Sequence, residues 1–216
     1  MTRRDRRTVE VRREEILTAT TELIDRVGLA AIRVGDVAAA LGVSPALVFY
    51  HFGTKDALVA DAFAHAVDRD LDRLDKVIGG ANAKDTDPLD RLRRVLRLYG
   101  PTGPATGWRL WIDAWALAQR EPTMRAVLRR MDERWCAVLR EVVEDGVATG
   151  VFRCPDPAAS VVRVSALLDG LSVAALVYRT VSRAQLRAWV TAAVAQELGL
   201  ESGHLTPASA PGTPGR

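Results

Sequence analysis

The residues whose types and spacing most strongly suggest a binding site lie in a short helix predicted over residues 45–52, with the sequence PALVFYHF. Val48 and Phe52 lie four residues apart, so both can pack inward on one face of that helix. Phe49 and Tyr50 then point outward, and a histidine follows them. Outward aromatic side chains of this kind are unlike an ordinary helix surface. They are typical of the second helix of a helix-turn-helix, which enters the major groove of DNA.

A second short helix and a tight turn are predicted to position this one. Residues 33–41 place apolar side chains on one helical face, and Gly42 ends that helix, because only glycine adopts a left-handed conformation without a Cβ clash. Ser44 offers a hydroxyl cap to the next helix. Pro45 is preset for its first position, and Ala46 follows on the outward side.

The remaining sequence predicts further helices and no strand. A 3.6-residue apolar period covers Thr8–Val27, Thr54 can cap a long helix from Lys55 to Ile78, and five more helices are predicted at 88–99, 108–120, 123–149, 158–178 and 183–198. The predicted fold is all-α with about nine helices. It has a three-helix helix-turn-helix head (1–53), an antiparallel helical bundle (54–200) and a disordered, Pro- and Gly-rich tail (201–216).

Charge is local rather than general. The net charge of the 216-residue chain is only +3, which excludes a protein that binds nucleic acid over its whole surface. Residues 1–13 hold six arginines against two acids, a net charge of +4. This segment is either an arm that contacts phosphates or a disordered solubilising tail.

Other classes of site find little support. Cys136 and Cys154 have no metal-ligand spacing around them and are predicted to be free thiols, and no cofactor, metal site or catalytic set is predicted. The N-terminus lacks a secretory signal. The most apolar run, 161–178, is interpreted as too polar and too short to cross a bilayer, so we expect a cytoplasmic protein.

The pattern resembles the TetR family of transcriptional regulators over roughly residues 10–60. The matching residues are Ile16, Ala19, Leu23, Gly28, Asp36-Val-Ala, Leu41-Gly-Val-Ser44, Val48, Phe49-Tyr-His-Phe52 and Lys55-Asp-Ala-Leu58. The C-terminal part looks like the regulatory domain of the betaine-regulator-like branch. The resemblance implies a cytoplasmic homodimer that binds a palindromic DNA operator, usually represses transcription, and is released by a small molecule. It also implies a head that binds DNA and a bundle that binds the ligand and dimerises.

Carried over residue by residue, the resemblance places Ser44 near a phosphate and Pro45 and Ala46 near base edges. Tyr50 and His51 would contact the DNA backbone, and Lys55 would meet a phosphate at the start of the next helix. Some positions depart from the family pattern. Arg33 replaces the usual hydroxyl cap, Gly35 has no side chain, and Leu47 and Phe49 replace residues with hydroxyls. We therefore expect base recognition through Phe49 and thymine methyl groups, through DNA shape, or through water.

Three tryptophans and a glutamine step along one helical face at intervals of three, four and four: Trp108, Trp111, Trp115 and Gln119. Trp135 follows on the next long helix. These residues are either core aromatics or the wall of a pocket for an apolar or cationic ligand, since indole faces attract cations. Asp169 lies in an apolar stretch and would pair with Arg163 or Arg109. Otherwise Asp169 or Asp113 would meet a cationic ligand.

The last two predicted helices are apolar over more than one face, which predicts a dimer interface. Its expected residues are Leu167, Leu171, Leu176, Leu186, Trp189 and Val190. The leading hypothesis is a ligand-responsive DNA-binding dimer rather than an enzyme. Two alternatives stay open: a constitutive DNA binder of the same fold without a ligand, and a helical enzyme or carrier with a vestigial head.

Overall fold

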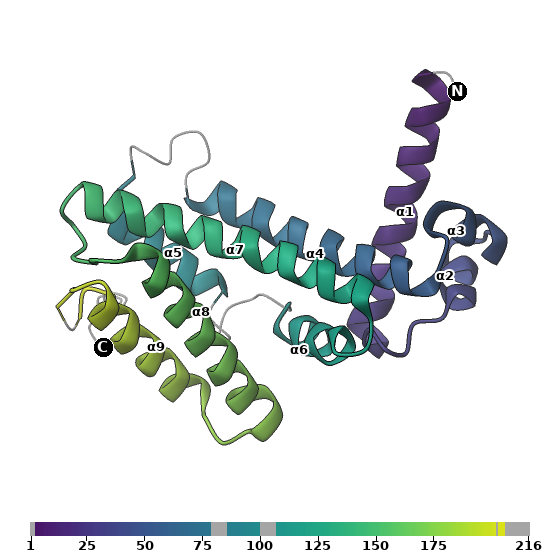
Figure 1. Cartoon of the computed structure of the whole chain (residues 1–216). Coiled ribbons are helices and arrows are strands. Elements are labelled where there is room, and N and C mark those ends of the chain that lie inside the picture. The colour runs from purple at the N-terminus through teal and green to yellow at the C-terminus, as the bar shows by residue number, and fades with distance from the viewer. Residues whose placement is uncertain (1–2, 79–85, 100–106, 202, 206–216) are drawn as a thin grey trace, which may run out of the picture. The chain divides into compact units, whose positions relative to one another are not determined.

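The structure is a computed structural model that describes residues 3–78, 86–99, 107–201 and 203–205 (Figure 1). These residues are helical with connecting turns, as the sequence predicted. The elements are α1 (Arg3–Val27), α2 (Val34–Leu41), α3 (Pro45–Phe52), α4 (Lys55–Ile78), α5 (Pro88–Tyr99), α6 (Gly107–Ala118), α7 (Pro122–Ala148), α8 (Pro157–Val173), the π-helical turn η2 (Ala174–Tyr178) and α9 (Arg183–Glu197).

The chain divides into two compact units, each described here by itself. The first comprises Met1–Asp72 and Thr106–Arg134, and the second Arg73–Ala105 and Trp135–Arg216. The first unit thus extends past the predicted boundary at residue 53, because most of α4, all of α6 and the first half of α7 pack with the head.

In the first unit, α1 packs against α2, and α2 packs against α3. The core contains Ile16 and Leu29 from α1 and the turn after it, Val37 from α2, Val48 from α3 and Phe63 from α4, all at most 1% exposed. α1 begins at Arg3 and not at Thr8 as predicted, since nothing in residues 3–8 breaks a helix. The predicted basic arm is therefore helical where the structure describes it.

The turn between α2 and α3 follows the sequence prediction. Gly42 ends α2 in the left-handed region, with a φ of 65°, and its N–H and that of Val43 return to carbonyls of the last turn. The Ser44 hydroxyl accepts a hydrogen bond from the Leu47 N–H at 3.3 Å, and Pro45 takes the first helical position. These caps fix where α3 starts, and therefore which of its residues face outward.

In the second unit, α8 packs against α9, as Figure 1 also shows. Arg91 of α5 is 1% exposed and pairs with Asp145 at 2.5 Å and with Glu141 at 3.0 Å, both on α7. The ring of Phe152 lies directly on Gly146, where a Cβ would come within 2.0 Å of the ring. The second unit is therefore stabilised in part by the ion pairs of the buried Arg91 and by a contact that only glycine permits.

Two residues of the segment predicted as a disordered tail take part in this unit. Leu205 is 6% exposed, and the His204 carbonyl accepts a hydrogen bond from the Arg93 Nε at 2.9 Å. The prediction of disorder from residue 201 is therefore wrong for these two residues, because an apolar side chain and a guanidinium anchor them. The predicted tail at 206–216 lies outside the described residues.

α8 and η2 form one continuous helical segment of 22 residues, Pro157–Tyr178, with a mean hydropathy of 1.7 over its most apolar window. Among the described residues this is the one helix that is unbroken, long and apolar enough to cross a membrane, which corrects the sequence interpretation that it is too short and too polar. A core helix of a soluble protein meets the same criterion. Only 28% of that window is buried within the chain, so much of its apolar surface is uncovered in a single copy.

Candidate nucleic-acid interface and aromatic cluster

The second helix of the helix-turn-helix presents its aromatic residues as predicted. Val48 and Phe52 are buried, whereas Phe49 is 45% exposed and Tyr50 is 75% exposed. At the start of the helix, Ser44, Pro45 and Ala46 are exposed on the surface. Helix α3 therefore has an anchored inner face and an outer face that combines aromatic rings with small residues.

Two of the predicted DNA-binding residues, Lys55 and Arg33, are exposed cations. Lys55 is exposed at the first position of α4, where Thr54 caps the helix by accepting a hydrogen bond from the Ala57 N–H at 3.1 Å. Arg33 precedes α2, is exposed and makes no side-chain cap hydrogen bond, as expected from the loss of a hydroxyl at this position. A lysine at the positive end of a helix suits a phosphate group.

His51 is half-buried at the end of α3, beside the ring of Tyr50, whose centroid lies 5.3 Å away. Burial lowers the pKa of His51 below its ordinary value of 6.5, and the nearby guanidinium groups of Arg13 and Arg12 lower it further. At neutral pH the His51 imidazole is therefore uncharged and can donate one N–H to an acceptor such as a phosphate oxygen.

Arg13 is a residue that the sequence analysis missed, because it was grouped with the basic N-terminal segment. Its guanidinium contacts the end of α3 and the Asp61 carboxylate of α4. One signal could have identified it. Arg13 lies three residues before Ile16, a fully buried residue of α1, and so it falls on the helical face that meets the rest of the head.

An aromatic cluster lies between α4 and α6 in the first unit. The Trp111 ring meets the fully buried Phe63 edge to face, with centroids 5.2 Å apart, and it lies 6.4 Å from the Trp115 ring. Trp108, Trp111 and Trp115 are all half-buried, so each keeps part of its indole surface available. The predicted tryptophan face therefore exists on α6.

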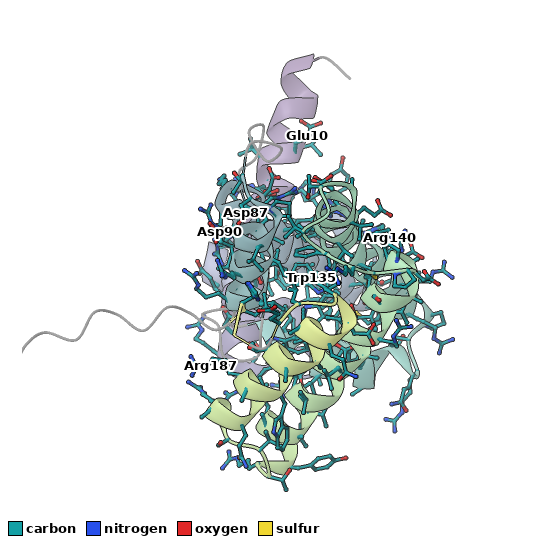
Figure 2. All side chains as sticks on the ribbon, turned by 90° about the vertical axis from the view of Figure 1, so that its left-hand side faces the viewer. Glu10, Asp87, Asp90, Trp135, Arg140 and Arg187 are labelled. Carbon is teal, nitrogen blue, oxygen red and sulfur yellow. The ribbon has the colours of Figure 1, made fainter. Side chains whose placement is uncertain are left out.

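The other predicted pocket residues are Gln119, Trp135 and Asp169, of which Gln119 belongs to the same unit as α6. α6 ends at Ala118, so Gln119 leaves the helical face of the tryptophans, is exposed, and uses its carbonyl to accept a hydrogen bond from Arg125. Trp135 (Figure 2) and Asp169 are half-buried residues of the second unit. Arg163, one expected partner of Asp169, instead pairs with Glu197 at 2.6 Å.

The partner that the structure gives Asp113 is a backbone N–H group, and not an arginine or a ring of the aromatic cluster. Its carboxylate accepts a hydrogen bond from the Leu29 N–H at 3.3 Å, just after α1 ends at Val27. A Cβ on Gly28, which has a φ of 80°, would come within 3.1 Å of the same carboxylate oxygen. Helix α6, which carries the tryptophans, is thereby joined to the end of α1 in the head.

The residues predicted for a dimer interface on α8, η2 and α9 differ in their exposure within the chain. Trp189 is 48% exposed, and Leu167, Leu171 and Leu176 are half-buried. Leu186 and Val190, in contrast, are only 1% and 5% exposed, so they belong to the core of the chain and not to a surface that a partner could contact. Three further residues add exposed apolar surface on α8 and η2: Val162, Val177 and Tyr178. Arg187 on α9 is also exposed (Figure 2).

Comparisons with known proteins agree with this architecture. Residues 16–62 match the model of the bacterial regulatory proteins of the tetR family, and residues 88–199 match that of the C-terminal domain of BetI-type transcriptional repressors. The chain is 31% identical over 128 residues to the HTH-type transcriptional regulator BetI of Stenotrophomonas maltophilia, a match that spans 57% of this chain and 63% of that regulator. It is 28% identical over 168 residues to BetI of Paraburkholderia phytofirmans, a match that spans 75% of this chain and 80% of that protein.

Two solved structures share the fold at a comparable identity. One is a transcriptional regulator from Saccharomonospora viridis in complex with choline, with a TM-score of 0.70, 28% identity, and coverage of 85% of this chain and 95% of that chain. The other is described as a TetR-family transcriptional regulator from Rhodococcus sp., with a TM-score of 0.71, 30% identity, and coverage of 87% and 98%. The chain therefore belongs to the TetR family of bacterial transcriptional regulators and carries a BetI-type C-terminal domain.

Proposed function

We propose that this protein is a cytoplasmic, non-enzymatic repressor that binds a palindromic operator as a homodimer and leaves it when a small organic cation binds. In this proposal residues 1–53 bind DNA, and residues 54–200 bind the effector and form the dimer. The observation that carries the proposal is the outer face of α3, on which Phe49 and Tyr50 are exposed while Val48 and Phe52 anchor the helix from within.

The DNA contacts divide into two kinds. Tyr50, His51, Ser44 and Lys55 carry hydroxyl, imidazole or ammonium groups suited to phosphates, which fix the position of the protein on the duplex. Phe49, with Pro45 and Ala46, presents apolar surface suited to thymine methyl groups. Because this face holds few groups that hydrogen-bond to bases, part of the specificity comes from DNA shape or from water.

The effector proposal is supported by the aromatic cluster around Trp111. Indole rings bind quaternary ammonium groups through their electron-rich faces, and Trp108, Trp111 and Trp115 each keep exposed indole surface. The related regulator from Saccharomonospora viridis was solved in complex with choline. We therefore propose a ligand of the choline type, with a cationic head and little further polarity.

The homodimer proposal is supported by the uncovered apolar surface of the second unit. Val162 is 61% exposed and Trp189 is 48% exposed, while η2 adds Val177 and Tyr178. An apolar surface of this kind on a protein without a membrane role needs a partner. A second copy would cover it and place two α3 helices about one DNA turn apart, roughly 34–36 Å, or a multiple of that distance.

The test uses purified full-length protein and a fluorescent duplex that it enriches from a random-sequence library. Fluorescence anisotropy should show binding, and added choline should release the duplex while quenching tryptophan fluorescence. Choline that quenches without releasing DNA, or that does neither, would favour a constitutive regulator. Failure to bind any duplex, even at low salt where phosphate contacts are strongest, would contradict the DNA-binding role itself.

A further inference from the structure

Arg13 makes three contacts that converge on the end of the recognition helix α3. Its Nη1 donates a hydrogen bond to the His51 carbonyl at 3.0 Å, and its guanidinium carbon lies 4.3 Å from the centroid of the Phe52 ring. Its Nη2 donates to the Asp61 carboxylate of α4 at 2.5 Å. One side chain of α1 therefore connects three helices of the head.

These contacts suit the end of a helix. The last carbonyls of a helix have no intrahelical donor, and a positive charge there also interacts favourably with the helix dipole. The Phe49 carbonyl receives the Gly53 N–H at 2.7 Å, whereas the His51 carbonyl receives Arg13. The planar guanidinium can stack on the Phe52 ring while it donates in two directions, a combination that a lysine ammonium does not offer.

The ion pair with Asp61 determines whether the Arg13 guanidinium can bind a DNA phosphate. An arginine that served mainly as a phosphate ligand would have its donors directed toward the DNA. Here the carboxylate of Asp61 faces the guanidinium at 2.5 Å, and the two side chains are about equally exposed, at 39% and 33%. The charge of Arg13 is thus already matched within the protein.

We propose that Arg13 and Asp61 are positioning residues for DNA recognition, which hold the end of α3 so that Phe49 and Tyr50 meet the bases and the backbone in register. This inference rests on the proposed function of α3 as the DNA-contacting helix. The two roles can be tested separately. Arg13 contacts α3 directly, whereas Asp61 acts on α3 only through its ion pair with Arg13.

The neighbouring pair Arg12–Glu15 offers a matched control. It also joins an arginine of α1 to a carboxylate, at 2.6 Å with exposures of 43% and 46%, but both residues lie within α1. The four variants Asp61→Asn, Arg13→Met, Glu15→Gln and Arg12→Met therefore compare the same changes of charge, with and without a hydrogen bond to α3. The charge of Arg12 acts on His51 as that of Arg13 does, so the two arginine variants share this electrostatic effect.

The experiment measures the affinity of each variant for two duplexes over a range of salt concentrations: the duplex enriched by the wild-type protein and a scrambled duplex of equal composition. Asp61→Asn should bind the enriched duplex about two- to fivefold more weakly, since it keeps an oxygen acceptor but removes the charge of an ion pair that is about a third exposed. Binding to the scrambled duplex should change little, and the slope of log K against log salt should stay the same. Glu15→Gln should bind no more weakly than wild type, because it removes a negative charge near DNA.

The opposite sign would overturn the inference. If Arg13 were a phosphate ligand that Asp61 restrains, Asp61→Asn would bind both duplexes more tightly, and Arg13→Met would weaken both equally with a lower salt slope. Unfolding is distinguished by circular dichroism and by hydrogen exchange at the Gly53 amide in free protein, which should accelerate in Arg13→Met but not in Arg12→Met. Unchanged exchange together with unchanged discrimination would also refute the role. Failure of the wild-type protein to bind any duplex would instead refute the proposed function.

Discussion

The carboxylate of Asp113 accepts a hydrogen bond from the backbone N–H of Leu29, 3.3 Å away, and so links α6 to the segment that leads into the helix-turn-helix. Leu29 is 1% exposed, which means that its N–H has no ready access to water as an alternative acceptor. The same α6 carries Trp111, which packs on Phe63 of α4. A change at the aromatic cluster therefore has a direct structural path to the end of α1.

This path predicts that Asp113→Ala weakens the coupling between effector and DNA. The ratio of DNA affinities without and with choline should fall toward one, because coupling free energies of regulators of this size are about 1–3 kcal/mol and one buried hydrogen bond is of that order. Asp113→Asn keeps an oxygen acceptor at the same place and should retain most of the ratio. Anisotropy titrations with saturating choline provide the measurement. Equal ratios in wild type and Asp113→Ala would contradict the path.

The depressed pKa of His51 predicts a pH dependence of DNA binding. The imidazole is neutral in the free protein at pH 7, because burial and the arginines Arg13 and Arg12 disfavour its charged form. A phosphate beside it favours the charged form, so binding takes up a proton and affinity should rise as the pH falls. Titrations from about pH 5 to pH 8 should show this rise in wild type but not in His51→Gln. A His51→Gln profile identical to that of wild type would exclude His51 as a backbone contact.

The exposed apolar surface of α8 predicts that a single acidic substitution there prevents dimerisation. Val162→Glu would bury a carboxylate in the proposed interface without a partner, which costs several kcal/mol, so the protein should become monomeric at micromolar concentration. Val27→Glu is the matched control, since Val27 of α1 is 53% exposed and lies outside the proposed interface. Light scattering after size-exclusion chromatography distinguishes the species. A Val162→Glu dimer as stable as the wild-type one would place the interface elsewhere.

The close contact between Gly146 and Phe152 predicts that a larger residue at position 146 destabilises the protein. Its missing Cβ makes room for Phe152, whose ring carbon would lie 2.0 Å from an added methyl group, so Gly146→Ala should lower the free energy of unfolding by about 1–3 kcal/mol. Gly35 of α2 is also helical but has nothing within 4 Å of an added Cβ. Gly35→Ala should therefore raise stability by up to about 1 kcal/mol. Urea denaturation of both variants checks the difference in sign.

The sequence was most informative where local chemistry decides the structure. Gly42, Ser44 and Pro45 determine the turn and the start of α3 within a few residues of one another, so the exposed face of α3 could be predicted from their order alone. Elsewhere α4 and α5 begin and end where predicted, and most other helix ends differ by one or two residues at most. The early start of α1 at Arg3 is the largest shift, since its first residues carry no capping signal.

Contacts between distant segments could not be predicted in the same way. Arg13 meets residues 38 and 48 positions later, and Leu29 meets a carboxylate 84 positions later, so neither partner is visible in a local pattern. In the sequence, Leu186, Val190 and Trp189 are all apolar residues of the same predicted helix, so each was equally suited to the interface. Only the packing of α9 shows that the two aliphatic residues face the core while the indole faces outward.

The surface formed by α3 and the start of α4 is tested most directly by the salt dependence of DNA affinity. Lys55→Met should lower the slope of log K against log salt by about 0.9, the share of one phosphate contact. Lys76→Met, which removes an exposed lysine near the other end of α4, should leave the slope unchanged. Equal slopes for wild type and Lys55→Met, or an equal loss in both variants, would contradict the docking of this surface on DNA.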